Sequence, residues 1–374
     1  MFGRRVTLFR LLGFEVRVDQ SWIVLAILVT WSLAVGLFPE YLPGQSTVVY
    51  WWMGVCGATG FFFSILFHEF CHSLVARRFG LPISGITLFI FGGVAEMNEE
   101  PPSARVEFLM AAAGPLSSIV LGALFFGAAS FATGPASAVL GYLASINGLL
   151  AVFNLVPAFP LDGGRILRAA LWRWSGDLAR ATRIASRFGS GFGIVIMFVG
   201  VVNFLRGNLV GGLWQFMIGL FLRSAAEASY RQVLVRKSLQ GETVAHFMNK
   251  APVTAPPSIT LQELVENYLY RYYFKMFPVM EDGRLIGCIT TQRVKQVPRE
   301  EWGRRTVAEI ADQCTVESAV APDADAAKVL GLMSRTGKTR LMVIEGDRLV
   351  GIISVKDILG YLAAKLNSGG EGGI

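Results

Sequence analysis

The sequence predicts a polytopic α-helical membrane protein of about six spans, with small β-hairpin elements, followed by a soluble α/β domain. Of its 374 residues, 53% are hydrophobic and only 16% are charged, and the mean hydropathy is +0.50. Soluble domains carry roughly 25% charged residues. The apolar excess is confined to about the first 230 residues, so we expect a membrane domain and a separate C-terminal domain.

Hydrophobic runs mark the candidate spans. They are Trp22–Phe38, Val48–Ala76, Val106–Phe131, Ala136–Val156, Phe188–Phe204 and Leu209–Leu222. The last two are short and rich in glycine, so the alternative for these two segments is a helical hairpin that does not fully cross the membrane.

Positive charges flank the spans almost entirely on one side, and of these charges the opposite loops carry only Arg206. They are Arg4, Arg5, Arg10 and Arg17 before the first span, Arg77 and Arg78 after the second, Arg165, Arg168, Arg173, Arg180, Arg183 and Arg187 after the fourth, and Arg223, Arg231, Arg236 and Lys237 after the sixth. Basic loops mark the cytoplasmic side, so we expect a multi-pass protein of the cell membrane with both termini cytoplasmic. This pattern accounts for the net charge of +7 without a nucleic-acid partner.

Two short segments of the membrane domain have strand character rather than helix character. Val6–Arg10 and Phe14–Val18 read as a strand pair around Gly13, and Ile86–Met97 reads as a hairpin that turns at Gly92-Gly93. Non-helical backbone at membrane depth needs protein or water to satisfy it. A sheet edge of this kind is suited to pairing with an extended polypeptide.

From Gln240 onward the sequence contains an internal repeat. Phe277–Thr290 aligns with Leu341–Ser354 at a constant offset of about 64 residues, and each unit reads as helix, strand, turn, strand and helix. We therefore expect a membrane domain over residues 1–230, a linker over 231–240, a first repeat over 241–300, and a second repeat with a tail over 301–374.

The stretch Phe67–His72 holds a metal-binding pattern inside an apolar span. His68 and His72 are four residues apart, so both imidazoles project from one helix face and can bind one metal ion. Glu69 is placed to take a proton from a metal-bound water. The same spacing occurs on solvated helix faces, but ionisable groups are costly in hydrocarbon, so this cluster indicates a functional site.

A hydrolytic zinc site needs three protein ligands and one open position. The chain has only three histidines, and His246 lies in the soluble part, so we expect a carboxylate as the third ligand. Asp162 is preceded by two prolines and followed by two glycines at the end of the fourth span. The alternative role of Asp162 is to cap the following helix. Zinc fits two histidines and an aspartate, although iron or cobalt would accept the same set.

These motifs resemble the site-two protease family of intramembrane zinc metalloproteases over about the first 225 residues. The match rests on the His-Glu-x-x-His pattern at His68–His72 and on the Asn-x-x-Pro-x-x-Pro-Leu-Asp-Gly-Gly-Arg run at Asn154–Arg165. The resemblance implies that His68, His72 and Asp162 bind one catalytic zinc ion and that Glu69 is the general base for attack of a zinc-activated water on the scissile carbonyl. It also implies that Asn154 helps to hold the substrate or the oxyanion. Asn154 could otherwise cap a helix or bond between helices. Substrates would be membrane-tethered regulators, such as an anti-sigma factor or a membrane-associated pro-protein.

The C-terminal repeat resembles a pair of cystathionine-β-synthase (CBS) modules. The resemblance implies that a cytoplasmic CBS pair modulates the enzyme and that Ser354 and Asp357 contact an adenine nucleotide. The first repeat has Thr290 but carries Arg293 where the aspartate would stand. The alternative is a folded module for docking or for homodimer formation.

A second function class is a CBS-gated transporter of metal ions or anions that uses the intramembrane histidines and aspartate. A transporter has no need of Glu69 between two ligands. The helix-breaking residues before Asp162 and the strand hairpin also favour proteolysis.

Overall fold

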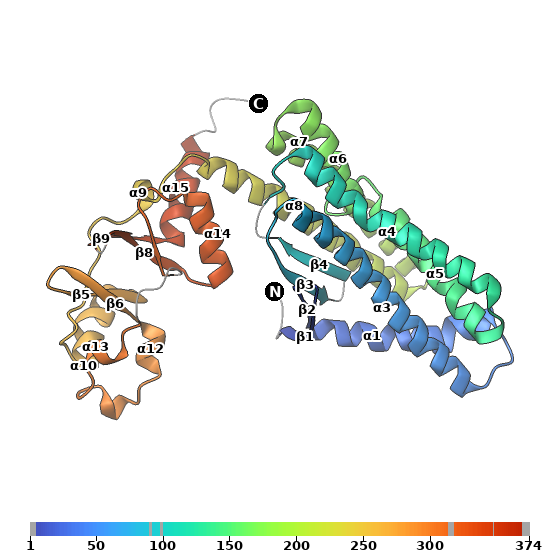
Figure 1. The fold of residues 1–374 in the computed structure, drawn as a ribbon, viewed down its shortest axis with the longest axis horizontal. Helices are drawn as coiled ribbons and strands as arrows, with labels where there is room; N and C mark the ends of the chain where they lie inside the picture. Colours follow the sequence, from blue (N-terminus) through green and yellow to red (C-terminus); the bar gives the residue numbers. More distant parts are fainter. Residues whose placement is uncertain (1–4, 90–91, 98–99, 313–317, 347, 369–374) are drawn as a thin grey trace. The chain divides into compact units, whose positions relative to one another are not determined.

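The computed structural model describes residues 5–89, 92–97, 100–312, 318–346 and 348–368. The chain divides into two compact units, Met1–Val233 and Leu234–Ile374. Figure 1 shows that the first unit is built from long helices with one small sheet, and that the second mixes short helices with strands.

The first unit is dominated by helices that are long and apolar. Its helical elements are α1 (Gln20–Ser32), the π-helical η1 (Leu33–Leu37), α2 (Phe38–Tyr41), α3 (Thr47–Arg78), α4 (Ala104–Phe131), α5 (Gly134–Asn154), α6 (Asp162–Ser175), α7 (Leu178–Leu205) and α8 (Leu209–Leu239). Six stretches of the described residues suit a membrane span by length and composition: Gln20–Tyr41, α3, α4, α5, α7 and α8. The predicted multi-pass helical fold is confirmed. Helices α7 and α8 have 28 and 31 residues, so both are long enough to cross fully.

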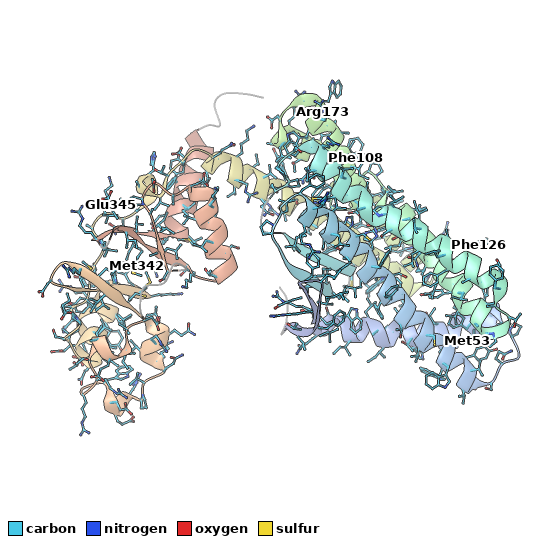
Figure 2. The ribbon with its side chains drawn as sticks, in the orientation of Figure 1. Met53, Phe108, Phe126, Arg173, Met342 and Glu345 are labelled. Atoms are coloured by element: carbon cyan, nitrogen blue, oxygen red, sulfur yellow. The ribbon has the colours of Figure 1, made fainter. Side chains whose placement is uncertain are left out.

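The outward faces of these helices are apolar. Phe126 on α4 is 70% exposed, whereas Met53 on α3 is buried between helices (Figure 2). Exposed phenylalanine on a long apolar helix is expected where the solvent is lipid.

A four-stranded sheet accompanies the helices, in the order β1 (Arg5–Leu11), β2 (Phe14–Asp19), β3 (Ile83–Phe89) and β4 (Gly92–Met97). Strand β2 runs parallel to β3, and the other two pairs are antiparallel. Both predicted hairpins are therefore present. The expected turn at Gly92-Gly93 is wrong, because β4 begins at Gly92 and Gly93 pairs with Leu88. Residues 90–91, between the two strands, lie outside the described residues.

The sheet packs against one side of α3. Their shared core consists of Phe14, Val18, Ile65, Phe70, Ile86 and Leu88. Successive residues on a helix are about 100° apart, so His68 and His72 lie on a different side of α3 from the residues that face the sheet. That other side of α3 contacts α4.

The basic segment after α5 contains helix α6, which is the helix expected to follow Asp162. A chain reversal over residues 155–161 leads into α6, and glycine is required where the two meet. A Cβ atom at Gly163 would lie 2.2 Å from the carbonyl oxygen of Leu155, and one at Gly164 would lie 2.2 Å from the backbone nitrogen of Phe159. Gly189 of α7 closes the same joint, since its Cβ would lie 1.8 Å from the carbonyl oxygen of Phe159. The position of Asp162 is thus set by backbone packed on backbone.

The second unit contains the predicted repeat. Its elements are α9 (Val244–Phe247), α10 (Leu261–Leu264), the π-helical η2 (Val265–Leu269), α11 (Tyr270–Tyr272), β5 (Met276–Glu281), β6 (Arg284–Thr290), α12 (Thr291–Lys295), the 3₁₀ helix η3 (Arg299–Glu301), α13 (Val307–Ile310), β7 (Ala319–Val320), α14 (Ala326–Thr336), β8 (Arg340–Glu345), β9 (Arg348–Ser354) and α15 (Val355–Ser368). The hairpins β5–β6 and β8–β9 have equivalent registers, with Val279 opposite Gly287 and Val343 opposite Gly351.

Each repeat has its own hydrophobic core. The core around hairpin β8–β9 includes Leu239, Val244 and Phe247, which lie ahead of hairpin β5–β6 in the chain. The core around hairpin β5–β6 includes Val307, which follows α12. The segment ahead of the first hairpin therefore completes the core of the second hairpin.

Candidate metal centre

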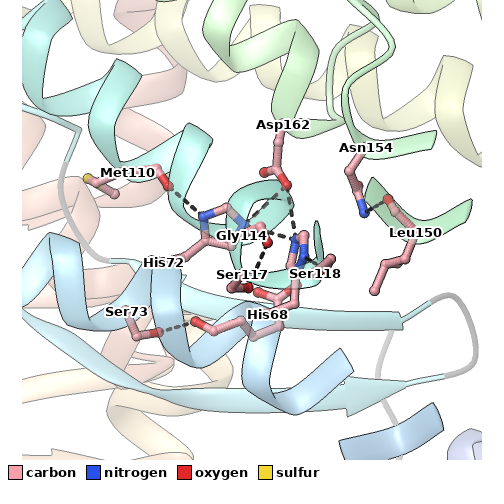
Figure 3. A network of polar contacts seen from close by, with 11 residues as sticks. His68, His72, Ser73, Met110, Gly114, Ser117, Ser118, Leu150, Asn154 and Asp162 are labelled. Carbon is pink, nitrogen blue, oxygen red and sulfur yellow. Dashed lines mark hydrogen bonds and ion pairs between the residues drawn. The ribbon is translucent and has the colours of Figure 1, made fainter. Parts of the chain in front are cut away.

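Two helices bring the three predicted ligands to one point. His68 and His72 project from α3, and Asp162 is the first residue of α6. The two Nε2 atoms are 3.1 Å apart, and Oδ2 of Asp162 lies 3.0 Å from Nε2 of His68 and 3.1 Å from Nε2 of His72 (Figure 3). All three side chains are buried. Among the described residues, this trio is the cluster of histidine, cysteine and acidic side chains that could hold a metal ion.

The far nitrogen of each imidazole has a partner on α4. Nδ1 of His72 lies 2.6 Å from the carbonyl oxygen of Met110, and Nδ1 of His68 lies 2.9 Å from Oγ of Ser118. A carbonyl oxygen only accepts, so Nδ1 of His72 carries the proton and Nε2 presents a lone pair. Sequence reasoning missed both partners. The available signal was the spacing of Met110, Gly114 and Ser118, which places them on one face of a helix.

The donor set fits a zinc ion. When the His72 imidazole is neutral, its Nε2 atom accepts hydrogen bonds, as does the ionised Asp162 carboxylate. Both groups point at the same small volume as Nε2 of His68. Acceptors this close repel one another unless a cation lies between them. Zinc bonds of 2.0–2.1 Å in a tetrahedron would place ligand atoms roughly 3.3 Å apart, close to the separations seen here.

Gly114 leaves the space for such an ion. A Cβ atom built on it would lie 2.1 Å from Nε2 of His72 and 2.5 Å from Nε2 of His68. Any side chain at position 114 would therefore fill the point on which the ligands converge. Helix α4 closes the site with bare backbone (Figure 3).

Glu69 follows His68 on α3 and is partly buried. A Cβ atom at Gly93 would lie 2.5 Å from Cγ of Glu69, so strand β4 passes directly over this side chain. The side chain of the predicted general base therefore lies against β4, and its backbone is next to that of the ligand candidate His68.

Asn154 is the last residue of α5. Its Nδ2 donates to the carbonyl oxygen of Leu150, 3.0 Å away in the same helix (Figure 3). This bond lies within the last turn of α5, and the role of Asn154 toward substrate stays a prediction.

Ser354 and Asp357 lie together at the start of α15. The backbone nitrogen and the hydroxyl of Ser354 donate to Oδ2 of Asp357 over 2.9 and 2.6 Å, and the backbone nitrogen of Asp357 donates to the Ser354 hydroxyl over 3.2 Å. Reciprocal bonds of this type cap a helix. At the equivalent position of the first repeat, Nε of Arg293 donates to Oδ1 of Asp312 over 2.8 Å. Nucleotide binding at Ser354 and Asp357 stays a prediction.

Sequence comparisons identify both parts of the chain. The pattern of peptidase family M50 matches residues 56–135 and 128–199, and that of the CBS domain matches residues 244–299 and 313–364. The protein Rip3 of Mycobacterium tuberculosis is 35% identical over 360 residues, which are 94% of this chain and 91% of Rip3. The chain belongs to peptidase family M50, the site-2 protease family.

A further relative agrees with M50 membership, and one solved structure is similar as well. A zinc metalloprotease of Methanocaldococcus jannaschii is 33% identical over 303 residues, which are 80% of this chain and 82% of that protein. The solved structure of a site-2 protease from the same organism is 28% identical, with a TM-score of 0.43 over 61% of this chain and 96% of that one. This M50 protein is therefore a multi-pass zinc metalloprotease with a CBS pair, and the alternative of a CBS-gated transporter is not supported.

Proposed function

We propose that this chain is an endopeptidase that hydrolyses peptide bonds in or near the transmembrane segments of membrane-tethered regulatory proteins. The observation that carries the proposal is the convergence of His68, His72 and Asp162 within a bundle of apolar helices. A buried cluster of this kind in a membrane domain marks a functional site. Membership of peptidase family M50 supplies the reaction class.

Nε2 of His68, Nε2 of His72 and Oδ2 of Asp162 would hold one zinc ion and leave a fourth position open. Bound there, zinc supplies Lewis acidity, which acidifies water and polarises a carbonyl oxygen. The chain's own contribution is to fix the three ligand atoms and to keep the site closed on the α4 side through Gly114.

Glu69 is proposed as the general base. Its carboxylate takes a proton from the attacking water and passes it to the nitrogen of the leaving amine. Its place beside His68 and under β4 supports this role, because a substrate strand laid along β4 would pass over the same carboxylate.

Strand β4 is proposed as the surface that binds the substrate backbone. Among the described strands it pairs with β3 alone, so its other edge has backbone groups to offer. A transmembrane helix has its amides bonded internally and must unwind before cleavage. Strand addition replaces some of those bonds. Asn154, at the end of α5, would then hold the substrate or the oxyanion through its amide.

The charge pattern supports a cytoplasmic location for both termini. Arg173, Arg180, Arg183 and Arg187 are exposed around the junction of α6 and α7. By the positive-inside rule this end of the bundle faces the cytoplasm. Asp162 begins α6 near the same end, so the metal centre would receive water from the cytoplasmic side.

The CBS pair is proposed to modulate the protease through one adenine nucleotide at Ser354 and Asp357, and to support a homodimer. The Arg293–Asp312 ion pair in the first repeat favours one nucleotide site over two. AMP and ATP should raise the thermal unfolding midpoint of the intact protein. Asp357→Ala should abolish that shift, whereas Arg293→Gln should keep it. An equal shift in all three proteins would contradict the assignment.

The substrate class is tested in cells. Membrane proteomes of cells with the wild type and with Glu69→Gln should differ by fragments released only by the wild type, from a protein such as an anti-sigma factor or a membrane-associated pro-protein. Both proteins should retain zinc, because Glu69 is not among the ligands. Identical fragments from both, with zinc bound, would contradict the role of Glu69. Purified wild type without zinc would contradict the metal centre.

A further inference from the structure

A buried ion pair joins α4 to α6 away from the metal centre. Glu107 on α4 is 0% exposed and Arg168 on α6 is 3% exposed. Nε of Arg168 donates to Oε1 of Glu107 over 2.6 Å, and Nη2 contacts the same oxygen. From the sequence, Arg168 was counted among the basic residues that mark the cytoplasmic side. The structure shows that its side chain is buried and paired.

Arg168 also contacts the segments that lead into α4 and α6. Its Nη2 lies 3.4 Å from Oε2 of Glu100, which precedes α4. Its guanidinium carbon lies 5.1 Å from the centre of the Phe159 ring, in the chain reversal just before Asp162. One side chain therefore contacts α4, the segment before α4 and the segment that presents Asp162.

The pair and the metal centre lie at matching distances along the two helices. Arg168 is six residues after Asp162, or about 9 Å along α6. Glu107 is seven residues before Gly114, or about 10 Å along α4. Glu107 shares a helix face with Met110, Gly114 and Ser118, since they follow at intervals of three, four and four residues. The ion pair thus fixes α6 on the same face of α4 that closes the metal centre.

We propose that Glu107 and Arg168 are positioning residues, which set how far α6 lies along α4 and so hold the Asp162 carboxylate within bonding reach of the two imidazoles. The inference rests on the proposed metal centre.

Stabilisation of the fold is a poor explanation for this pair. Burying two charges carries a large desolvation penalty, and well-packed apolar residues in their place are often as stable or more so. Oε2 of Glu107 is buried and has no hydrogen-bond partner among the described residues, which adds to that penalty. An arginine–carboxylate pair does, however, fix the direction and the distance between the guanidinium and the carboxylate.

The test compares metal binding in variants of the full-length protein in detergent. A single Arg168→Met change would leave a buried carboxylate without a counter-charge. The main variant is therefore the double change Glu107→Gln with Arg168→Met, which removes both charges. Arg168→Lys keeps the charge but loses the fork of donors. The matched control is Asn203→Leu with Gln215→Leu, which removes a 2.7 Å side-chain bond between α7 and α8.

Two measurements report on the metal ligands and not on the overall fold. Zinc affinity is measured by competition with a chelator, and the visible absorption spectrum of the cobalt-substituted protein reports on the ligand set. The double variant should bind zinc about 10-fold more weakly, at the lower end of the range for residues that orient metal ligands. Its cobalt spectrum should shift, Arg168→Lys should be intermediate, and the Asn203/Gln215 control should match the wild type.

A folded double variant with wild-type zinc affinity and cobalt spectrum would overturn the proposal. Failure of both the double variant and Arg168→Lys to fold would also overturn it, because the pair would then be needed for the fold itself. Asp162→Asn distinguishes a failure of the proposed metal centre from a failure of the role proposed for the ion pair. If Asp162→Asn leaves zinc affinity unchanged, the proposed metal centre fails. If it weakens zinc and the double variant does not, only the role of the ion pair fails.

Discussion

A Cβ atom on Gly114 would stand 2.1 Å from Nε2 of His72, inside the volume that a metal ion would occupy. Replacing this glycine should therefore act on the metal and not on the helix. Alanine is the better helix former by about 1 kcal/mol, so α4 itself is not weakened by the change.

Gly114→Ala is expected to purify without zinc and without proteolytic activity, while its helical content matches the wild type. Zinc is measured by mass spectrometry and helical content by circular dichroism. Gly127→Ala, on the same helix, is the control, because nothing lies within 4 Å of a Cβ at that position. A full zinc complement in Gly114→Ala would show that the ion does not lie where the ligands converge.

Gly93→Ala should separate catalysis from metal binding. Its Cβ would lie 2.5 Å from Cγ of Glu69, so the base must move while the imidazoles stay in place. We expect zinc content to be unchanged and kcat to fall by about 10²-fold, within the range for loss of a general base. Single-turnover cleavage of a membrane substrate measures the rate. Unchanged cleavage, or loss of zinc, would count against the proposed place of Glu69.

Ser118→Ala should weaken metal binding without abolishing it. The Ser118 hydroxyl lies 2.9 Å from Nδ1 of His68 and orients the ring. Loss of such a partner typically lowers metal affinity by about 10-fold or more. Chelator competition measures the change. Ser130→Ala on the exposed end of α4 should bind zinc as the wild type does, and equal affinity in all three proteins would show that the hydroxyl does not orient His68.

The CBS unit should lose stability in acid through Glu263. The backbone N–H and the hydroxyl of Thr260 donate to this carboxylate and hold its pKa below the usual 4.5. Stability from ionised Glu263 is therefore present above pH 4.5 and is lost as the pH falls through the lowered pKa of the folded protein.

Glu263→Gln tests this dependence, because the amide can still accept these bonds but does not titrate. The wild type should unfold at a higher denaturant concentration than Glu263→Gln at neutral pH, and the difference should vanish well below pH 4.5. The intact protein in detergent is used, with hydrogen exchange of α10 as the local probe. A difference that persists in acid would contradict the role of Glu263.

Local patterns made much of this protein predictable from its sequence. The spans are long apolar runs, and the CBS hairpins recur with the same register. His68 and His72 are four residues apart, so one helix is enough to bring them together. Asp162 was recognisable because prolines and glycines surround a rare carboxylate.

Contacts between distant parts of the chain were not predictable. Ser118 and Met110 are separated from their histidines by 50 and 38 residues, and Glu107 is 61 residues from Arg168. No spacing rule links such positions. A charge near the end of a hydrophobic run looks the same in sequence whether it faces water or a buried partner. The acidic residue in the first turn of α4 was the one available hint.

The joint formed by Gly163, Gly164 and Gly189 has an evolutionary consequence. Every missense codon change at a glycine adds a Cβ atom, and at these three positions that atom would collide with main chain, which has no alternative rotamer to adopt. Single neutral substitutions therefore cannot replace these three glycines, although they can change the residues on the lipid-facing surface. Divergence of the enzyme toward new targets must proceed around these three codons.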